Sequence, residues 1–363
     1  MKKRSILILC FAMTAFCVML LSSCSGTGGV GDDDMITVVD MEGTEVTIPK
    51  NVDTVACISP SATDLMIAFG LGDKIVGTYR SFLYNPWAAV IAPEASDYKP
   101  YSYSVSAEEL LADGVDLVIL QDTENAEALR NAGIPVVAVH QYSPTGAFDD
   151  KVYDTARLLG EIFGGEAKEK ADVWIRDVES AIAEIRSVIG TESSERTVYY
   201  VNGEKDKGLF YSDGGNSMIS RVLDIAGVCL ATEQYEVLNV HAVSDEEMLS
   251  LDPFAMLIGG AYQNNLMDEL ASSEIWSALA CSRENRVYRI PVAMIGIENV
   301  SAETPVMLRY AASLFCDDYE YDLKAGLKEN IRQYFGYELS DADVENMCRG
   351  LDSNGERMVD AAT

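Results

Sequence analysis

A long amphipathic segment between positions 166 and 189 constrains this chain more than any other feature. Apolar residues recur there at steps of three and four, and charged residues fill the other positions, which is the period of an α-helix with one buried face. A helix of about 24 residues is roughly 36 Å long, the width of a small domain. Gly164 and Gly165 separate it from a shorter helix predicted over 150–163. The long helix therefore predicts a rigid connection between two larger bodies.

Similar segments flank this helix on both sides. Residues 105–109 and 243–247 both read Val-Ser-x-Glu-Glu, and apolar runs follow them at 117–120 and 255–258. An internal repeat of this kind predicts two similar lobes. We expect a signal peptide at 1–23, a flexible tether at 24–35, an N-terminal lobe at 36–147, connecting helices at 148–190, a C-terminal lobe at 191–336 and an acidic C-terminal extension at 337–363.

Strands and helices alternate within each predicted lobe, which indicates an α/β fold with parallel sheets. A long loop rich in aromatic residues should follow the strand at 75–78, and residues 335–337 should close the folded body. After them we expect one short helix and a frayed end. Strands are predicted at 44–48, 52–58, 75–78, 117–120, 136–139, 197–201, 255–258 and 286–290, and helices at 60–69, 124–132, 218–226, 266–273 and 302–315. Two further helices should begin at Ser106 and Ser244.

The first residues have the pattern of an export signal. Lys2, Lys3 and Arg4 precede an uncharged apolar run at 6–21, which is too short to predict a membrane span. The sequence Leu-Ser-Ser-Cys at 21–24 resembles the bacterial lipobox, which implies that Cys24 is lipidated; an ordinary signal peptide is the alternative. The glycine-rich residues 25–35 then predict a tether. We expect a protein anchored by lipid to the outer face of the cell membrane, or held in the periplasm.

Composition limits the partners of the exported body. The net charge of −31 argues against nucleic acid and against anionic lipid as binding partners. The 48% of hydrophobic residues supply enough material for two cores. An odd number of cysteines follows Cys24, and none has CxxC spacing. Two alternatives therefore remain: buried free thiols, or one disulfide bridge among Cys229, Cys281 and Cys316. The cysteines beyond Cys24 are Cys57, Cys229, Cys281, Cys316 and Cys348.

Several segments together resemble one family. Residues 55–64, 69–78, both Val-Ser-x-Glu-Glu segments and Arg-Val-Tyr at 286–288 look like the iron-siderophore, cobalamin and haem substrate-binding proteins of ABC importers. The resemblance covers 36–336. It implies the class III periplasmic-binding-protein fold, in which two Rossmann-like lobes are joined by one rigid helix and the ligand lies in the cleft. It also implies delivery to ABC permease subunits and their ATPase by a monomeric receptor that is not an enzyme.

The repeated segments also have a physical interpretation. Serine followed three residues later by glutamate is a capping box, so Ser106 with Glu109 and Ser244 with Glu247 should begin helices. The glutamates between them are not needed for capping. By the resemblance, Glu108 and Glu246 match the carboxylates that dock into arginines of the permease. The alternative is that both are exposed first-turn glutamates favoured by the helix dipole.

The ligand should lie beyond the carboxyl ends of the parallel strands. Aromatic rings are abundant there, and they suit a large flat or apolar chelate, whereas Arg80 suits an anionic one. An aromatic residue such as Trp87 can instead serve only to pack a loop. The candidate ligand-binding residues are Arg80, Tyr79, Tyr84, Trp87, Tyr103, Tyr211, Asn216, Tyr262 and Met294.

Direct binding of a metal by the protein is not expected. The two histidines, His140 and His241, lie in different lobes without partners at ligand spacing, so iron or cobalt should arrive already chelated and no cofactor is expected. A ferric siderophore is the first candidate, followed by a corrinoid or haem. A small oxyanion or nickel chelate is a further candidate, because Tyr-Asn-Pro-Trp at 84–87 resembles subfamilies with mixed metal substrates.

Catalytic motifs are absent from the sequence: it has no G-x-S-x-G, no H-E-x-x-H and no phosphate-binding glycine loop. We therefore predict no catalytic residues. A chelatase-like enzyme is the remoter alternative, because a related fold occurs in chelatases. A purely adhesive lipoprotein would explain the tether but not the duplicated lobes. The rigid helix predicts little change of shape on ligand binding.

Overall fold

A five-stranded parallel sheet organises the first part of the computed structural model, which describes residues 34–139, 152–190, 194–203, 208–235 and 241–358. Its order is β5-β4-β3-β6-β7, with every neighbouring pair parallel. The central strands are buried on both faces, which explains their continuous apolar sequences. The strands are β3 (Val55–Ile58), β4 (Ile75–Tyr79), β5 (Lys99–Tyr101), β6 (Leu117–Leu120) and β7 (Val136–Ala138).

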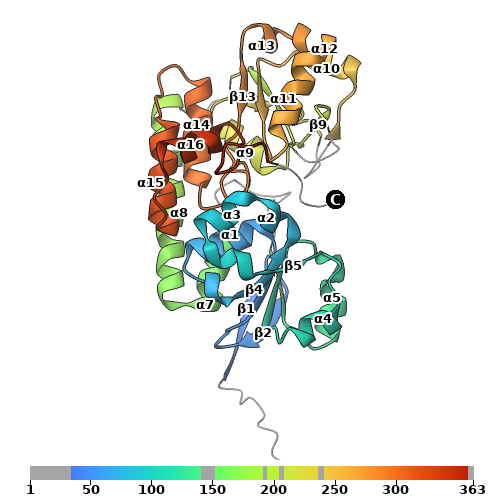
Figure 1. Ribbon diagram of the computed structural model, residues 1–363, viewed down its shortest axis with the longest axis vertical. Helices are drawn as coiled ribbons and strands as arrows, with labels where there is room; N and C mark the ends of the chain where they lie inside the picture. Colours follow the sequence, from blue (N-terminus) through green and yellow to red (C-terminus); the bar gives the residue numbers. More distant parts are fainter. Residues whose placement is uncertain (1–33, 140–151, 191–193, 204–207, 236–240, 359–363) are drawn as a thin grey trace, which may run out of the picture. The chain divides into compact units, whose positions relative to one another are not determined.

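A four-stranded parallel sheet repeats this order in the second part of the chain, as β10-β8-β12-β13. Among the residues described, only the counterpart of the edge strand β5 is missing. We call the elements around the two sheets the N-terminal and C-terminal lobes (Figure 1). The predicted α/β fold with two similar parallel sheets is confirmed. The strands are β8 (Thr197–Val201), β10 (Cys229–Leu230), β12 (Ala255–Ile258) and β13 (Val287–Arg289).

Two small strand pairs accompany the main sheets. One contains β1 (Met35–Val39) and β2 (Glu45–Pro49), and β2 covers the strand expected at 44–48. The other pairs β9 (Tyr211–Ser212) antiparallel with β11 (His241–Ala242). Neither pair joins the parallel sheets.

Helices cover both sheets. Around the N-terminal sheet they are α1 (Pro60–Ala68), α2 (Arg80–Tyr84), α3 (Pro86–Ile91), α4 (Ala107–Ala112) and α5 (Ala126–Asn131), with short 3-10 turns at Gly72–Lys74, Pro93–Asp97 and Thr123–Asn125. In the C-terminal lobe they are α9 (Met218–Ile225), α10 (Asp245–Leu251), α11 (Gln263–Ser272), α12 (Glu274–Ala278), α13 (Ala280–Arg283), α14 (Thr304–Phe315), α15 (Leu323–Phe335) and α16 (Asp341–Cys348). The expected aromatic loop after β4 thus contains two helices and the strand β5.

The long helix is present as α8 (Gly165–Ile189), with 25 residues, and it runs along the side of both lobes (Figure 1). It packs against α7 (Asp154–Phe163), which contacts α1, and against α9 and α14 of the other lobe. Gly164 between α7 and α8 has φ of 59°, which favours glycine. The indole N–H of Trp174 donates to the carbonyl of Ser301 at 3.1 Å. One rigid element is therefore fixed to both lobes.

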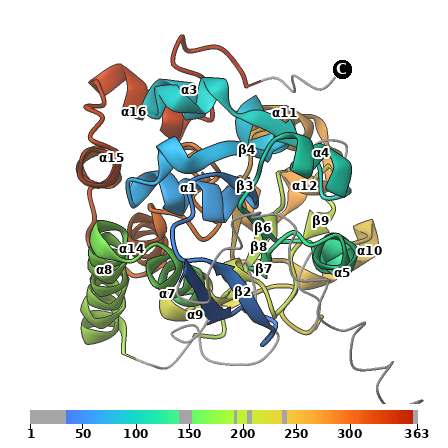
Figure 2. The ribbon, with the colours of Figure 1, turned by 90° about the horizontal axis from the view of Figure 1, so that it is seen from below.

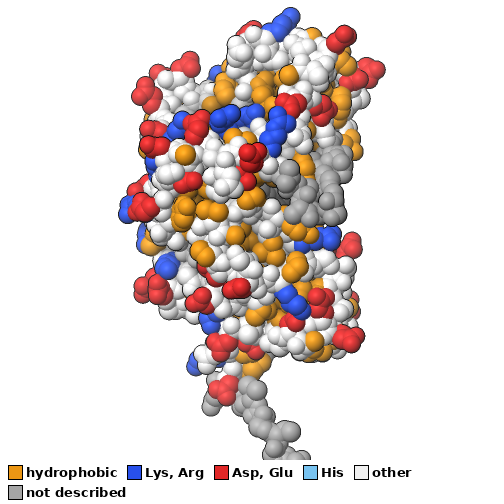
Figure 3. Space-filling view, in the orientation of Figure 1, with side chains coloured by type: hydrophobic (Ala, Val, Ile, Leu, Met, Phe, Trp, Pro, Cys, Tyr) orange, Lys and Arg blue, Asp and Glu red, His pale blue; other side chains and the backbone are white. Residues whose placement is uncertain are grey.

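Both lobes belong to one compact unit that begins at Ile36. The boundaries expected at 147 and 190 therefore stay predictions. The shorter connecting helix, expected from 150, begins at Asp154 as α7. Residues 152–153 form a turn, and 150–151 lie outside the described residues. Acidic side chains are spread over both lobes on the face shown in Figure 3, in keeping with the net charge of −31.

The C-terminal extension differs from the expectation. The short helix is confirmed as α16, which begins with a capping box formed by Ser340 and Asp343. The expectation of a frayed end is wrong for the described residues, because a bridge joins Leu351 to Arg357, Trp87 donates to the carbonyl of Leu351, and Met358 is only 6% exposed. The folded body therefore continues well past Tyr337.

All cysteines in the described residues are free. Of the two alternatives left open by the sequence, the free thiols are the ones observed. Cys57 and Cys281 are fully buried, and burial raises the pKa of the Cys57 thiol to about 12. Among the described residues no helix is long and apolar enough to cross a membrane.

Candidate functional site

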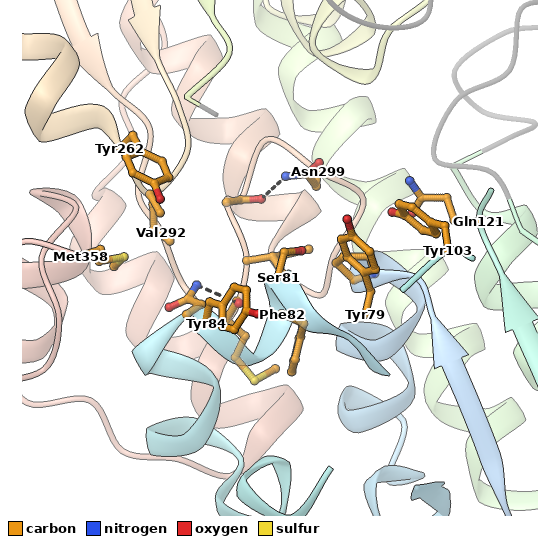
Figure 4. Close-up of a pocket in the computed structure, with 16 residues that line it drawn as sticks. Tyr79, Ser81, Phe82, Tyr84, Tyr103, Gln121, Tyr262, Val292, Asn299 and Met358 are labelled. Atoms are coloured by element: carbon orange, nitrogen blue, oxygen red, sulfur yellow. Dashed lines mark hydrogen bonds between the residues drawn. The ribbon is translucent and has the colours of Figure 1, made fainter. Parts of the chain in front are cut away.

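A cavity of about 400 Å³ lies between the two sheets, at the carboxyl ends of their strands (Figure 4). The N-terminal lobe forms one wall from the ends of β3, β4, β5 and β6. The C-terminal lobe forms the other wall from the turn after β12 and the segment after β13. The lining residues are Pro60, Tyr79, Ser81, Phe82, Tyr84, Asn85, Tyr103, Gln121, Ala261, Tyr262, Val292, Met294, Ile295, Gly296, Asn299 and Met358.

Two stacked tyrosines dominate the N-terminal wall. The rings of Tyr79, the last residue of β4, and Tyr103, which follows β5, lie 4.1 Å apart at 15° to each other. Stacking holds both rings in one orientation beside the cavity. Tyr84 adds a third phenol at the end of α2 (Figure 4). This wall therefore offers flat apolar faces with hydroxyl groups at their edges.

Asn85 connects this wall to the opposite lobe. Its side-chain oxygen accepts from the amide of Trp87 at 3.0 Å and so caps α3, which begins with Pro86. Its side-chain nitrogen donates to the carbonyls of Ala293 and Met294, each at 2.8 Å. A local helix cap thus also fixes the cavity segment of the C-terminal lobe.

A buried carboxyl group, Glu298, fixes the C-terminal wall. Its Oε1 accepts from the backbone N–H of Gly260 at 2.9 Å, which positions the turn that carries Tyr262. Burial raises the pKa of Glu298 to about 7, and the nearby Asp213 acts in the same direction. Asn299 donates to the carbonyl of Gly296 at 3.0 Å (Figure 4). Buried polar groups therefore hold the backbone of this wall in place.

The lining residues carry no full charge. Among the described residues that line the cavity there is no Lys, Arg, His, Asp or Glu. The polar groups are phenols, amides and one serine hydroxyl, and the apolar ones include two thioethers. A ligand with a large net charge would lose hydration here without gaining a counter-charge from these residues. The described part of the lining is therefore polar and apolar but uncharged.

A second pair of buried carboxyl groups joins the lobes outside the cavity lining. Asp64 of α1 accepts from the backbone N–H of Ala302 at 2.7 Å, and Glu303 immediately precedes α14. Asp64 Oδ2 and both Oε atoms of Glu303 have no hydrogen-bond partner among the described residues. Burial, together with Glu303, raises the pKa of Asp64 well above its usual range, and burial raises that of Glu303 to about 7. This pair holds protons at a pH where exposed carboxyls are ionised.

Five of the nine expected ligand residues line the cavity. These are Tyr79, Tyr84, Tyr103, Tyr262 and Met294. Strand ends were the signal that located them, since each lies at or shortly after the end of a strand.

The other four expected residues lie outside the lining in this structure. Arg80 is exposed as the first residue of α2, where its side chain keeps its hydration. Trp87 is fully buried in α3, and its indole N–H donates to the carbonyl of Leu351 at 2.8 Å. Tyr211 lies in β9, paired with Ala242, and Asn216 lies in the turn before α9. Trp87 therefore packs behind the cavity, which was the alternative for this residue.

Several lining residues were not among the residues predicted from the sequence. Phe82 and Asn85 occur in the segment expected as a loop, and Asn85 belongs to the Tyr-Asn-Pro-Trp motif at 84–87. Gly296 and Asn299 lie after β13 without any periodic pattern. Met358 comes from the segment expected to fray. Gln121 directly follows β6, so the rule of strand ends could have identified it.

The two candidate docking glutamates occupy equivalent places. Glu108 and Glu246 are exposed in the first turns of α4 and α10. The capping box is complete at Ser244, whereas at Ser106 only the serine half is formed, at 3.2 Å from the amide of Glu109. In both ribbon views α4 and α10 lie on the side opposite α8 (Figures 1 and 2).

The remaining expectations concern metal and lipid. In the part of the chain that the structure describes, no group of three or more His, Cys, Asp or Glu side chains could hold a metal ion. His140 lies outside the described residues, as do Cys24 and nearly all of the tether.

Comparisons with known proteins agree with this architecture. The chain is 24% identical over 262 residues to the uncharacterized ABC transporter substrate-binding lipoprotein YvrC of Bacillus subtilis, covering 70% of this chain and 78% of YvrC. It is 24% identical over 245 residues to the vitamin B12-binding protein of Vibrio parahaemolyticus, covering 62% of this chain and 81% of that protein. The solved structure of the Haemophilus influenzae molybdate periplasmic binding protein MolA, bound to molybdate, superposes with a TM-score of 0.71 at 17% identity, covering 84% of this chain and 99% of MolA.

The family itself is shown by the match to a family model. The model described as periplasmic binding protein matches residues 55–293, which contain both parallel sheets and α8. The relatives named above are solute-binding receptors rather than enzymes. This chain belongs to the periplasmic binding protein family, and it is the extracytoplasmic substrate-binding component of an ABC importer.

Proposed function

We propose that this receptor binds a metal chelate of low net charge, with a ferric siderophore as the first candidate, in the cavity between its lobes. The observation that carries the proposal is the lining: four tyrosines and two methionines, with no charged side chain among the described lining residues. Aromatic faces and thioethers suit the organic shell of a chelate, and hydroxyl and amide groups suit its polar edges. The metal then needs no ligand from the protein.

A corrinoid or haem is the second candidate. The relative from Vibrio parahaemolyticus is named as a vitamin B12-binding protein. Haem has a flat face for the stacked pair of Tyr79 and Tyr103, and a tyrosine phenolate can ligate haem iron. Against this candidate, a cavity of about 400 Å³ is at the small end of ligand pockets, so a whole corrinoid would protrude from it.

A small oxyanion or nickel chelate is the third candidate. MolA, which shares the fold, binds molybdate. A doubly charged oxyanion needs cationic or multiple N–H donors around it, and the described lining offers only the side-chain amides of Asn85, Gln121 and Asn299. Asn85 already donates to two carbonyls. Because the described lining lacks cationic side chains, we rank the oxyanion below a neutral chelate.

Docking to the permease is proposed at Glu108 and Glu246. Both carboxylates are exposed on the first turn of a short helix, one on each lobe, and both helices lie on the side opposite α8 (Figures 1 and 2). Carboxylates on both lobes can contact both subunits of a permease and fix the orientation of the receptor. We further propose that the receptor is a monomer tethered through lipidated Cys24.

Ligand binding is proposed to change the arrangement of the lobes only slightly. Glu184 of α8 accepts from Arg309 at 2.9 Å and from the Tyr319 hydroxyl at 2.7 Å, while Trp174 binds Ser301. Asn85 adds hydrogen bonds beside the cavity. Small-angle scattering with and without ligand should give the same radius of gyration, and a clear contraction would contradict this proposal.

The experiment that tests the ligand class is a titration of the chain from Ser25 onward. The probes, added separately, are the neutral ferric hydroxamate ferrichrome, an anionic ferric tris-catecholate, cyanocobalamin, haemin and molybdate. Binding is followed by tryptophan fluorescence, and calorimetry confirms each result. We expect saturable binding of the neutral ferric chelate and weaker binding of the anionic catecholate, because the described lining holds no cation. Tight binding of molybdate alone would overturn the proposal.

A further inference from the structure

The segment Leu351–Met358, which we call the C-terminal strap, lies outside the matched family region at 55–293. It folds as a tight turn closed by an antiparallel bridge between Leu351 and Arg357. The Asp352 side chain accepts from the amides of Asn354 at 2.9 Å and Glu356 at 2.8 Å. These bonds give the strap a defined local structure.

The strap and the residues before it are anchored to the C-terminal lobe. Arg357 pairs with Asp268 of α11 at 2.6 Å. The side chain of Asn264, also on α11, donates to the carbonyl of Gly350 at 2.7 Å. Two contacts with α11 therefore hold the strap near its end at Arg357 and at Gly350, the residue before it.

The same segment is anchored to the N-terminal lobe. The indole of Trp87 is fully buried in α3 and donates to the carbonyl of Leu351 at 2.8 Å. This bond joins positions 264 residues apart and crosses from one lobe to the other beside the cavity. The strap is therefore a further connection between the lobes, in addition to α8, Asn85 and the pair of Asp64 and Glu303.

The last described residue of the strap reaches the cavity. Met358 lines it together with Tyr84 and Val292, one from each lobe (Figure 4). Met358 is 6% exposed, although charged and exposed residues precede it. A thioether at this place gives the wall an adaptable apolar surface.

We propose that the C-terminal strap is part of the ligand-binding site, with Met358 as a residue that determines specificity and Trp87 as the residue that positions the strap. Met358 limits the cavity on one side and selects for an apolar ligand surface there. The identity of the ligand rests on the proposed function, whereas the structural role of the strap does not.

The structural role is tested by comparing a chain that ends at Gly350 with one that ends at Met358. Hydrogen exchange is measured for the amides of 82–91 and 291–299. We expect exchange at least about fivefold faster in the shorter chain, because both cavity segments lose contacts. Trp87→Phe, which removes the indole donor together with the five-membered part of the ring, should give a smaller change of the same kind. Equal exchange in all chains would overturn the proposal.

The specificity role is tested with ferrichrome as the probe. Met358→Ala should weaken binding about fivefold and Met358→Glu at least about twentyfold, because a carboxylate in an apolar wall opposes an apolar ligand surface. Glu356→Ala, at an exposed position two residues away, is the matched control and should bind as the unmodified chain does. Unchanged affinity in both Met358 variants would overturn the specificity role. If the unmodified chain does not bind ferrichrome, the ligand class fails, and the exchange experiment still decides the role of the strap.

Discussion

The two lobes repeat one strand order but present different chemistry to the cavity. The N-terminal wall consists mainly of side chains, with the stacked pair Tyr79 and Tyr103 at its centre. The C-terminal wall has a single tyrosine, Tyr262, among mainly aliphatic and thioether side chains, and Glu298 holds the turn after β12 that carries this tyrosine. Substitutions on the first wall should therefore change ligand affinity alone. Substitutions that disturb the second should change the stability of the fold as well.

The backbone packing behind the C-terminal wall is very close. Gly203, which follows β8, faces Gly259 and Gly260 in the turn after β12, and a Cβ added to Gly203 would lie 1.7 Å from the carbonyl oxygen of Gly259. Because the obstacle is backbone, no side-chain rotation can make room for it. This contact sets the position of the turn that carries Tyr262.

The largest effect is therefore expected for Gly203→Ala. The two strand ends must separate, and the free energy of unfolding should fall by about 3 kcal/mol or more, measured by urea denaturation. Gly160→Ala is the matched control. A Cβ added to Gly160 of α7 would lie 3.3 Å from its nearest neighbour, the Cα of Lys168 in α8. The free energy of unfolding should therefore change by no more than about 1 kcal/mol. Equal losses in both variants would contradict the exceptionally close backbone packing at Gly203.

The next effect concerns pH and Glu298. In the folded chain the pKa of the Glu298 carboxyl is about 7, whereas its ordinary value is 4.5. The stability from the protonated form is therefore complete below pH 4.5 and is lost as the pH rises through 7, a difference of about 3 kcal/mol. Glu298→Gln should flatten the dependence of unfolding free energy on pH across this window.

The pair of Asp64 and Glu303 titrates in the same direction, so the unmodified chain should still lose stability with rising pH when Glu298 is replaced. Glu303→Gln provides the matched comparison. Both variants should flatten the stability profile, but only Glu298→Gln should alter the pH dependence of ligand binding. A Glu298→Gln profile identical to that of the unmodified chain would exclude the raised pKa.

A smaller effect is expected on the N-terminal wall. Tyr103→Leu removes the ring that stacks on Tyr79 and should weaken ligand binding about tenfold, with a change in unfolding free energy below about 1 kcal/mol. Tyr211→Leu changes a tyrosine outside the cavity lining and should leave affinity unchanged. Titration calorimetry gives the affinities, and thermal unfolding gives the stabilities. A large loss of stability in Tyr103→Leu would remove the contrast between the walls.

The sequence was sufficient to predict the architecture, because strands and helices leave periodic apolar patterns. The repeated Val-Ser-x-Glu-Glu segments correspond to the starts of α4 and α10, and the amphipathic stretch corresponds to α8. The tyrosines at strand ends could be located for the same reason. Their places follow from local order alone.

The rest of the site depends on contacts between distant segments. Nothing near Trp87 shows that its indole donates to Leu351, so a residue expected in the cleft proves to be buried support. Met358 lies in a polar segment without periodicity, and only its packing places it in the cavity wall. The raised pKa of Glu298 likewise results from burial that no sequence pattern indicates.

The smallest effects per substitution are expected at the docking helices, where the lobes are most alike. Glu108→Lys and Glu246→Lys each reverse one exposed charge, and an exposed ion pair contributes little by itself. Each should therefore lower stimulation of the reconstituted importer's ATPase only about threefold, whereas the double variant should lower it about tenfold or more because both lobes lose their contact. Glu179→Lys, an exposed glutamate on α8, controls for charge on the opposite side and should have no effect. If one of the two glutamates carried the whole effect, the lobes would differ at the permease as they differ at the cavity, and docking would depend on one lobe alone.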